Sequence, residues 1–181
     1  MAALGADVIK VESAKRPDGM RFTTVKPPSE AGWWEWSMVY QGVNCNKRNL
    51  TLDLDRADGR ALLLDLIETT DVVIDNFSPR VMDGFGLTWD VIHAHNPRSI
   101  MVRMPAFGLD GPWRDRTGFA QTMEQACGLA WITGFPDRPP LIPRGACDPT
   151  AGMHALVALL AALHERESGG EGRFVEVPMI E

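Results

Sequence analysis

The composition of the chain is that of a globular protein and excludes several classes of partner. Its 181 residues are 45% hydrophobic and 23% charged, which is enough apolar material for a sizeable core. The formal net charge of −6 argues against a nucleic acid or an anionic membrane as a nonspecific partner, and no apolar run is long enough to span a bilayer.

The cysteines indicate a reducing compartment. Cys45, Cys127 and Cys147 are odd in number and widely spaced, and neither they nor the histidines show metal-ligand spacing. The first residues lack the basic start and apolar core of a signal peptide. We therefore expect a cytoplasmic protein without a metal site. A thiol nucleophile at Cys147 is a weak alternative, because no neighbouring basic partner that would lower its pKa is evident.

The first predicted elements alternate between strand and helix. Residues 6–12 form a short buried strand, and residues 13–36 form a long polar loop rich in Pro, Gly and Trp. Residues 49–54 alternate as a strand does, and a helix follows through residue 67. The Trp33, Trp34 and Trp36 cluster is better explained by loop or interface packing than by a ligand surface.

The middle of the chain continues the pattern. Between its two terminal aspartates, the segment of residues 71–75 is entirely apolar, which is typical of a central parallel strand buried on both faces. Pro79 suits the first turn of a short helix that ends near Gly84 and Gly86, and a second short helix covers residues 89–93. Residues 99–104 are the next strand, closed by Pro105 and a Gly-rich loop.

The last third contains the longest predicted helix. Residues 119–130 are predicted to be helical and residues 135–143 to be a loop, while residues 173–177 form a final strand. The long helix covers residues 149–167 and ends at Gly169-Gly170. Its large apolar residues fall on one face, and its alanines would let it pack closely. The large residues are Met153, Leu156, Val157, Leu160 and Leu163, and the alanines are Ala151, Ala155, Ala158, Ala161 and Ala162.

This order of elements predicts an α/β fold with an open, mostly parallel, Rossmann-like sheet and helices on both faces. Such sheets bind ligands beyond the carboxyl ends of their strands, where Asn76 to Ser78, Pro105 to Gly108 and Asp148 are expected. A Gly-x-Gly-x-x-Gly fingerprint, a Walker phosphate loop and a Gly-x-Ser-x-Gly elbow are all absent. Nucleotide-dependent redox chemistry, phosphoryl transfer and serine hydrolysis are therefore disfavoured.

Asp148 is the most informative single residue, because it stands between a Pro/Gly-rich loop and the long apolar helix. It suits a helix N-cap, with Pro149 at the first helical position. This segment alone favours the cap, because caps far outnumber carboxylate nucleophiles, but a nucleophile at the mouth of a pocket is the alternative and the two roles are compatible. His154, six residues further on, is better explained by packing than by acid–base chemistry.

An ordered set of segments resembles one family, the class III CoA-transferases, also called the CaiB/BaiF family. Each segment alone is weak, but together they cover nearly the whole chain. The segments are residues 5–12, 46–54, 71–79, 85–87, 96–98, 107–112, 118–119, 133–140, 148–152, 161–166 and 170–177.

The resemblance implies that Asp148 is the catalytic aspartate, which attacks an acyl-CoA thioester and then carries CoA as an aspartyl thioester to a carboxylic acid. Coenzyme A would be a substrate, and no cofactor would be bound permanently. The segments that match the CoA-binding segments of the family are Leu52, Asp53, Leu54 and Asp55; Asn76, Phe77 and Ser78; and Thr117, Gly118, Phe119 and Ala120.

Two departures from the family pattern bear on function. Members that transfer formyl-CoA carry basic residues at the positions of Ser13, Gly84 and Thr117, which this chain lacks. Its candidate replacements are Lys15, Arg16, Arg80 and Arg116. The racemase branch of the family, the alternative enzyme, uses a His in a loop that would match the region of Gly118. This chain has Phe119 and Ala120 there, which favours transfer over racemisation.

The resemblance also implies that residues 1–181 are a fragment of the CoA-transferase large domain. A first strand and helix would precede Met1, a second half would follow Glu181, and the full-length protein would form an intertwined homodimer. Two non-catalytic alternatives remain open. One is a CoA-binding or assembly module, and the other is a generic flavodoxin-like domain in which Asp148 only caps a helix.

Overall fold

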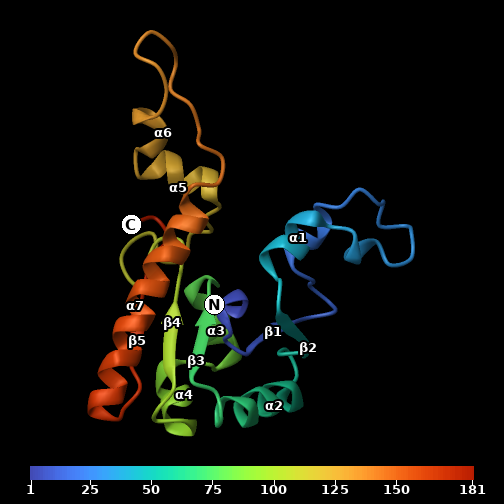
Figure 1. The fold of residues 1–181 in the computed structure, drawn as a ribbon, viewed down its shortest axis with the longest axis vertical. Helices are drawn as coiled ribbons and strands as arrows, with labels where there is room; N and C mark the ends of the chain where they lie inside the picture. Colours follow the sequence, from blue (N-terminus) through green and yellow to red (C-terminus); the bar gives the residue numbers. More distant parts are fainter. The chain divides into compact units, whose positions relative to one another are not determined.

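The computed structural model describes residues 1–181 as two compact units, Met1–Leu63 and Leu64–Glu181, with the boundary inside helix α2 (Figure 1). A short 3₁₀ helix, η1 (Ala2–Leu4), opens the first unit. The order of strands and helices follows the predicted alternation. The first unit holds strands β1 (Val8–Glu12) and β2 (Lys47–Thr51), 3₁₀ helices η2 (Gly19–Phe22) and η3 (Trp33–Glu35), α1 (Met38–Val43) and most of α2 (Ala57–Ile67).

The first unit is built on a parallel pair of strands. Val8 of β1 is paired with Lys47 of β2, and the register continues to Glu12 and Thr51. The strand predicted at residues 49–54 begins and ends earlier, so that Leu52 to Asp55 leave the carboxyl end of β2. The predicted loop at 13–36 contains only η2 and η3 as regular structure.

The second unit contains a three-stranded parallel sheet. Its strands are β3 (Val72–Asp75), β4 (Ile100–Arg103) and β5 (Phe174–Glu176), in the order β3-β4-β5. All four residues of β4 are buried. The prediction that residues 71–75 form a central strand was wrong, because β3 lies at an edge of this sheet and Ile74 is half exposed. An apolar run alone does not reveal a strand's place in the sheet.

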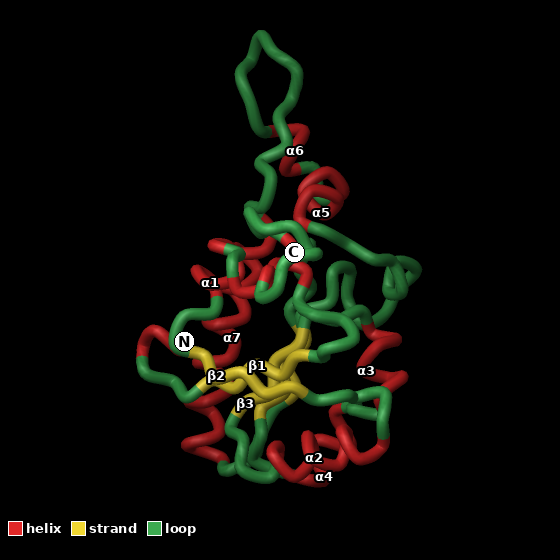
Figure 2. Tube along the Cα trace, turned by 90° about the vertical axis from the view of Figure 1, so that its right-hand side faces the viewer, coloured by secondary structure: helices red, strands yellow, loops and turns green.

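Helices cover both faces of this sheet, as predicted. On one face, Ala151, Ala155 and Leu159 of α7 (Cys147–Gly169) pack against Ile100 and Val102 of β4. On the other, the ring of Trp89 in α4 (Trp89–His95) lies 5.8 Å from the ring of Phe174 in β5. Helix α3 (Pro79–Phe85) belongs to that second side, and Figure 2 shows α3 and α7 on opposite sides of the strands.

Helix α7 packs through its small residues. The predicted apolar face was wrong, because Met153, Val157 and Leu160 are 61%, 68% and 55% exposed. The buried stripe is mostly alanine, with Leu159 as its one large side chain. Alanine allows the helix backbone to approach the sheet closely, so the buried face is the one with the smaller side chains.

The region before α7 holds two short helices where one was predicted. Helix α5 (Ala120–Ala126) and helix α6 (Leu129–Ile132) are separated at Gly128, whose φ of 85° is left-handed. The hydroxyl of Thr122 accepts a hydrogen bond from the Phe119 N–H at the start of α5. A loop then leads from residue 133 to α7 and includes the segment predicted as loop.

Helix α7 begins at the carboxyl end of the sheet. Near its other end, Arg166 donates hydrogen bonds to the Asp71 carboxylate and to the Arg98 carbonyl, which precede β3 and β4. The last turn of α7 is thereby fixed at the amino ends of these strands. Its first turn lies at the opposite end, beside α5 (Figure 1), where parallel α/β sheets bind their ligands.

Candidate active site

Asp148 lies in the first turn of α7, one position after the helix begins. The helix begins at Cys147, and its N-cap is Ala146, which has no side chain that could cap it. The prediction that Asp148 is the N-cap and Pro149 the first helical residue was therefore wrong. The Asp148 side chain is exposed, and it makes no hydrogen bond or ion pair within the chain.

A buried carboxylate from another helix satisfies the N–H groups that lead into α7. Glu124 of α5 is 0% exposed. Its Oε1 accepts hydrogen bonds from the N–H groups of Gly145 and Ala146, each at 2.6 Å, and its Oε2 accepts one from Arg144 at 2.9 Å. Arg144 and Gly145 both have positive φ, 64° and 118°, which turns successive N–H groups toward one anion.

The pKa values of Glu124 and Asp148 shift in opposite directions. Burial alone raises the pKa of Glu124, but hydrogen bonds from the N–H groups of Gly145, Ala146 and Arg144 outweigh burial and hold that pKa below its ordinary value. Partial desolvation raises the pKa of Asp148, and the negative charge of Glu124 raises it further. Asp148 is thus a more basic carboxylate than an ordinary aspartate.

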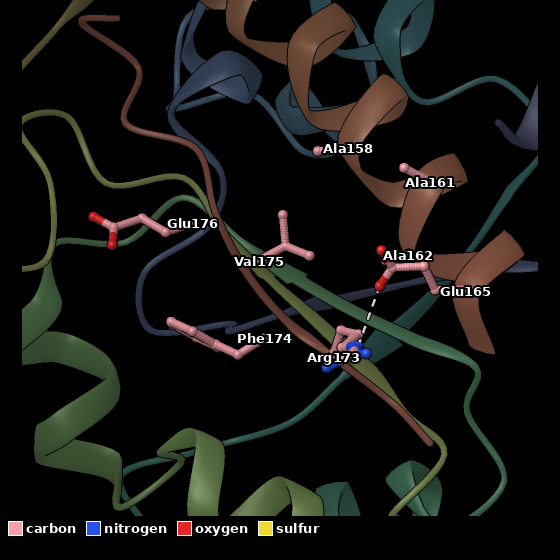
Figure 3. Close-up of a pocket in the computed structure, with 8 residues that line it drawn as sticks. All are labelled: Ala158, Ala161, Ala162, Glu165, Arg173, Phe174, Val175 and Glu176. Carbon is pink, nitrogen blue, oxygen red and sulfur yellow. Dashed lines mark ion pairs between the residues drawn. The ribbon is translucent and has the colours of Figure 1, made fainter. Parts of the chain in front are cut away.

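Two cavities occur in the second unit, and the smaller one adjoins the first turn of α7. It has a volume of about 390 Å³ and is lined mainly by apolar residues of α6, of α7 and of the final segment, among them Cys147 and Ile180. The larger, about 580 Å³, is an open groove between α7 and β5 that ends at the Glu165–Arg173 ion pair (Figure 3). Neither cavity is lined by Asp148 itself, but Cys147, the residue before it, lines the smaller one.

The predicted CoA-binding segment Asn76 to Ser78 follows β3 and is held by a buried ion pair. Asp75 accepts a hydrogen bond from the Phe77 N–H at 3.1 Å, and its other oxygen lies 3.3 Å from Nε of Arg103 in β4. Burial raises the pKa of Asp75, although Arg103 and the Phe77 N–H oppose that rise. The pair fixes the turn at the carboxyl end of the sheet.

The predicted segment Thr117 to Ala120 packs against the loop that follows β4. A Cβ added at Gly118 would lie 2.5 Å from the Ala106 side chain, so only glycine fits at this position. Phe119 is 73% exposed at the start of α5. The segment therefore lies at the same end of the sheet as Asn76 to Ser78.

The predicted segment Leu52 to Asp55 belongs to the first unit. Asp53 forms an ion pair with Lys15, with Nζ and Oδ2 2.6 Å apart, and this pairing lowers the pKa of the Asp53 carboxyl. The backbone of Asp53 also approaches Gly59 of α2 so closely that a Cβ there would lie 2.1 Å from the Asp53 carbonyl oxygen. Lys15, a candidate phosphate ligand, is thus next to the predicted CoA-binding segment.

The other candidate phosphate ligands differ in how they are held. Arg16 and Arg80 are exposed and form no ion pair. The Arg116 guanidinium lies 5.5 Å from the Trp113 ring centroid. Arg114, by contrast, is bound to Asp83 of α3 at 2.6 Å.

Sequence reasoning missed two buried charges at this end of the sheet. Glu124 is the only charged residue between Arg116 and Asp137, and Arg103 interrupts an apolar strand. An isolated charge within an apolar segment is itself a signal, since such residues are rarely buried without a partner. In addition, no group of His, Cys, Asp and Glu side chains is placed to hold a metal ion, and no helix has the length and apolarity needed to cross a membrane.

Comparison with known proteins identifies relatives along the whole chain. The family model described as CoA-transferase family III matches residues 1–181. The chain is 38% identical to a succinyl-CoA–D-citramalate CoA-transferase of Chloroflexus aurantiacus, over 100% of this chain and 44% of the relative. It is 37% identical to a formyl-CoA:oxalate CoA-transferase of Streptomyces avermitilis, over 99% of this chain and 42% of the relative.

Solved structures agree with these sequence matches. A CaiB/BaiF family protein of Brucella suis matches with a TM-score of 0.85 and 35% identity, over 98% of this chain and 47% of that chain. A Mycobacterium tuberculosis protein matches with a TM-score of 0.83 and 31% identity. The chain spans just under half the length of these relatives. Because the fold and a family model matching the whole chain agree, the chain belongs to the class III CoA-transferase family, also called CaiB/BaiF.

Proposed function

We propose that these 181 residues form part of the large domain of a CoA-transferase in which Asp148 is the nucleophile. The observation that carries the proposal is the position of Asp148, exposed in the first turn of α7 with a raised pKa and no partner in the chain. A carboxylate nucleophile needs to be accessible and free of competing hydrogen bonds, and Asp148 meets both conditions, while the N-terminus of α7 favours its ionised form. The relatives named as CoA-transferases support the reaction class.

The proposed reaction has four balanced steps. An Asp148 oxygen attacks the acyl-CoA carbonyl, which forms a mixed anhydride and releases the CoA thiolate. The thiolate attacks the aspartyl carbonyl, which forms aspartyl-CoA thioester and releases the first acid. The acceptor carboxylate attacks this thioester, which forms a second anhydride and frees the thiolate again. The thiolate then attacks the acceptor's acyl carbon, which gives the new acyl-CoA and restores Asp148.

The three predicted CoA-binding segments are assigned to the donor and its leaving group. Leu52 to Asp55, Asn76 to Ser78 and Thr117 to Ala120 leave strand ends or enter helices, where backbone groups are free to meet a ligand. Lys15 is the candidate that would balance a CoA phosphate beside Asp53. Racemisation is not favoured, since Phe119 and Ala120 offer no acid–base group in that loop.

The assembly and location of the complete protein are part of the same proposal. An intertwined homodimer is consistent with the exposed apolar side chains of α7, among them Val157 and Leu160. The cytoplasmic location predicted from the cysteines stays a prediction. Succinyl-CoA is the first donor to test, because several relatives are named for it.

The experiment that tests this function is intact-mass analysis of the complete protein after incubation with succinyl-CoA and hydroxylamine. We expect a hydroxamate on Asp148 that is lost in Asp148→Ala, because hydroxylamine captures an activated aspartyl carbonyl. Succinyl-CoA binding without any label would contradict the nucleophilic role and favour a CoA-binding module. A folded protein that binds no CoA would favour a flavodoxin-like domain in which Asp148 has only a structural role.

A further inference from the structure

The connection between α5 and the start of α7 contains a carboxylate that the transfer reaction does not use. Glu124 is completely buried, yet it meets no cation. Its partners are the backbone N–H groups of Arg144, Gly145 and Ala146. A buried charge that is satisfied only by backbone dipoles keeps its full negative field, in contrast to one neutralised by Arg or Lys.

The loop before α7 is shaped to bind an anion, and Glu124 is that anion. Consecutive positive φ values at Arg144 and Gly145 make successive N–H groups converge on one point. The helix dipole of α7 favours negative charge at the same place. In many proteins such a concavity binds phosphate or a substrate carboxylate. Here it is already filled from within the chain.

We propose that Glu124 is a positioning residue for Asp148: it holds the entrance of α7 in place and occupies the N–H donors that would otherwise solvate the nucleophile. This proposal rests on the proposed role of Asp148. Asp148 follows the Glu124-bound loop by two residues and has no hydrogen-bond donor of its own. The Asp148 carboxylate is therefore held in place and receives no hydrogen bond from the chain, which leaves its oxygens free to attack an acyl carbon.

The electrostatic surroundings agree with this role. The charged group that acts on Asp148 is Glu124 of α5, and the thiol of Cys147, the preceding residue of α7, interacts with both carboxylates. Burial raises the pKa of the Cys147 thiol, with further contributions from Cys127, Glu124 and Asp148, so that thiol is neutral at pH 7. Glu124 is then the one charge that acts on Asp148 at close range, and it makes the nucleophile more basic.

The variant Glu124→Gln tests the proposal, since it keeps the shape of the side chain and removes its charge. We expect the plateau of the pH profile, which is the highest rate of Asp148 labelling by succinyl-CoA and hydroxylamine, to fall about 100-fold. A loss of this size is expected when a reacting group is displaced from its position. We also expect the acid limb of that rate to move to lower pH, because loss of the Glu124 charge lowers the pKa of Asp148. Glu167→Gln, the same charge change at the exposed far end of α7, should leave both unchanged.

A direct titration separates this inference from the proposed function. The complete protein is labelled with ¹³C at aspartate carboxyls, and the Asp148 signal is identified by its loss in Asp148→Asn. A lower pKa of Asp148 in Glu124→Gln supports the inference even if the wild type forms no hydroxamate, in which case only the proposed function fails. An unchanged pKa overturns the inference, even if Asp148 is labelled normally.

Chemical rescue guards against a variant that is merely unstable. Glu124→Ala leaves a space beside the three N–H donors, and formate can fill it with a carboxylate. We expect formate to restore at least a tenth of the labelling rate, whereas formamide, its neutral analogue, should restore none. Equal rescue by both would show that the space and not the charge matters, and would overturn the electrostatic part of the proposal.

Discussion

Two carboxylates, one in each unit, show how the same residue type serves different purposes. Glu12 at the end of β1 is bound by the Arg21 guanidinium, with its Oε2 3.0 Å from the Tyr40 hydroxyl. Burial raises the pKa of Glu12, but Arg21 and the other donors outweigh burial and lower it. Glu124 at the entrance of α7 also has a lowered pKa, but its donors are backbone N–H groups.

The difference lies in what each carboxylate does to its surroundings. Arg21 neutralises Glu12, and its guanidinium also stacks 3.8 Å from the Tyr40 ring centroid, so the cluster holds the loop of residues 13–36 in place. Glu124 has no counter-charge, so its field reaches Asp148 and makes that carboxylate more basic. A paired buried charge fixes structure, whereas one satisfied by dipoles also acts on its neighbours.

The largest expected effect is on stability, and it concerns Glu12, the carboxylate that is paired with an arginine. Arg21→Met should lower the free energy of unfolding of the first unit by about 3 kcal/mol, because it removes the buried guanidinium and leaves Glu12 with only Lys10, whose Nζ is 3.9 Å from Oε2. Denaturant melts monitored by tryptophan fluorescence measure the loss. The matched control is Arg48→Met, which removes an exposed pair with Asp7 and should cost less than about 1 kcal/mol. Equal losses would mean that burial of the pair is not what matters.

The next effect concerns the close packing at a predicted CoA-binding segment. Gly118→Ala should cost about 1–3 kcal/mol and raise the KM for succinyl-CoA, because the new Cβ would collide with Ala106. Gly84→Ala in α3 is the control, since nothing lies within 4 Å of its added Cβ and alanine favours a helix. If the two variants behave alike in thermal melts and steady-state kinetics, the segment is not held as described.

A smaller effect is expected on the KM for the CoA donor when a candidate phosphate ligand is changed. Lys15→Glu should raise the KM for the CoA donor about tenfold with little change in kcat, because it removes a phosphate partner and repels the ligand. The same measurement on Arg80→Glu and Arg116→Glu tests two of the other three candidates. An unchanged KM in both would exclude them as phosphate ligands, and an unchanged KM in Lys15→Glu would exclude Lys15.

The smallest effect is on stability and follows from the raised pKa of Asp148. Between the ordinary aspartate pKa and this raised value, the folded protein holds a proton that the unfolded chain has lost. Stability is therefore lost as pH rises through that interval. Asp148→Asn should raise the melting temperature at neutral pH by at most about 2 °C, since the exposed carboxylate is screened. It should have no effect below both pKa values, and a rise there too would point to another cause.

The sequence predicted the fold more fully than the site, and particular residues show why. The alternation of strands with Pro- and Gly-punctuated helices was sufficient for a parallel α/β sheet, and Gly86 ends α3 as predicted. The packed face of α7 was not predictable from hydrophobicity, because Ala155 and Ala162 are buried for their small size while Val157 is exposed. Pattern analysis assigns large apolar residues to the core and cannot see how near a partner lies.

The sequence predicted which residues form the candidate site, and their roles stay predictions, but it did not predict the contacts that hold Asp148 in place. Asp148 was identified from its place before an apolar helix, although the helix begins two residues earlier than an N-cap role requires. Glu124 was missed, because its partners are backbone groups 20 to 22 residues later, which no side-chain pattern marks. Long-range contacts with the main chain depend on loop conformation, here the positive φ of Arg144 and Gly145.

The most direct test of the central claim follows oxygen atoms through the reaction. The complete protein is incubated with succinyl-CoA and a carboxylic acid acceptor labelled with ¹⁸O in both oxygens, and the peptide that contains Asp148 is sequenced by mass spectrometry. If the Asp148 carboxylate forms the anhydride with the acceptor, it retains one acceptor oxygen, and the first turnover adds about 2 Da to Asp148 alone. Transfer of CoA that leaves Asp148 unlabelled would contradict a nucleophilic role for this residue.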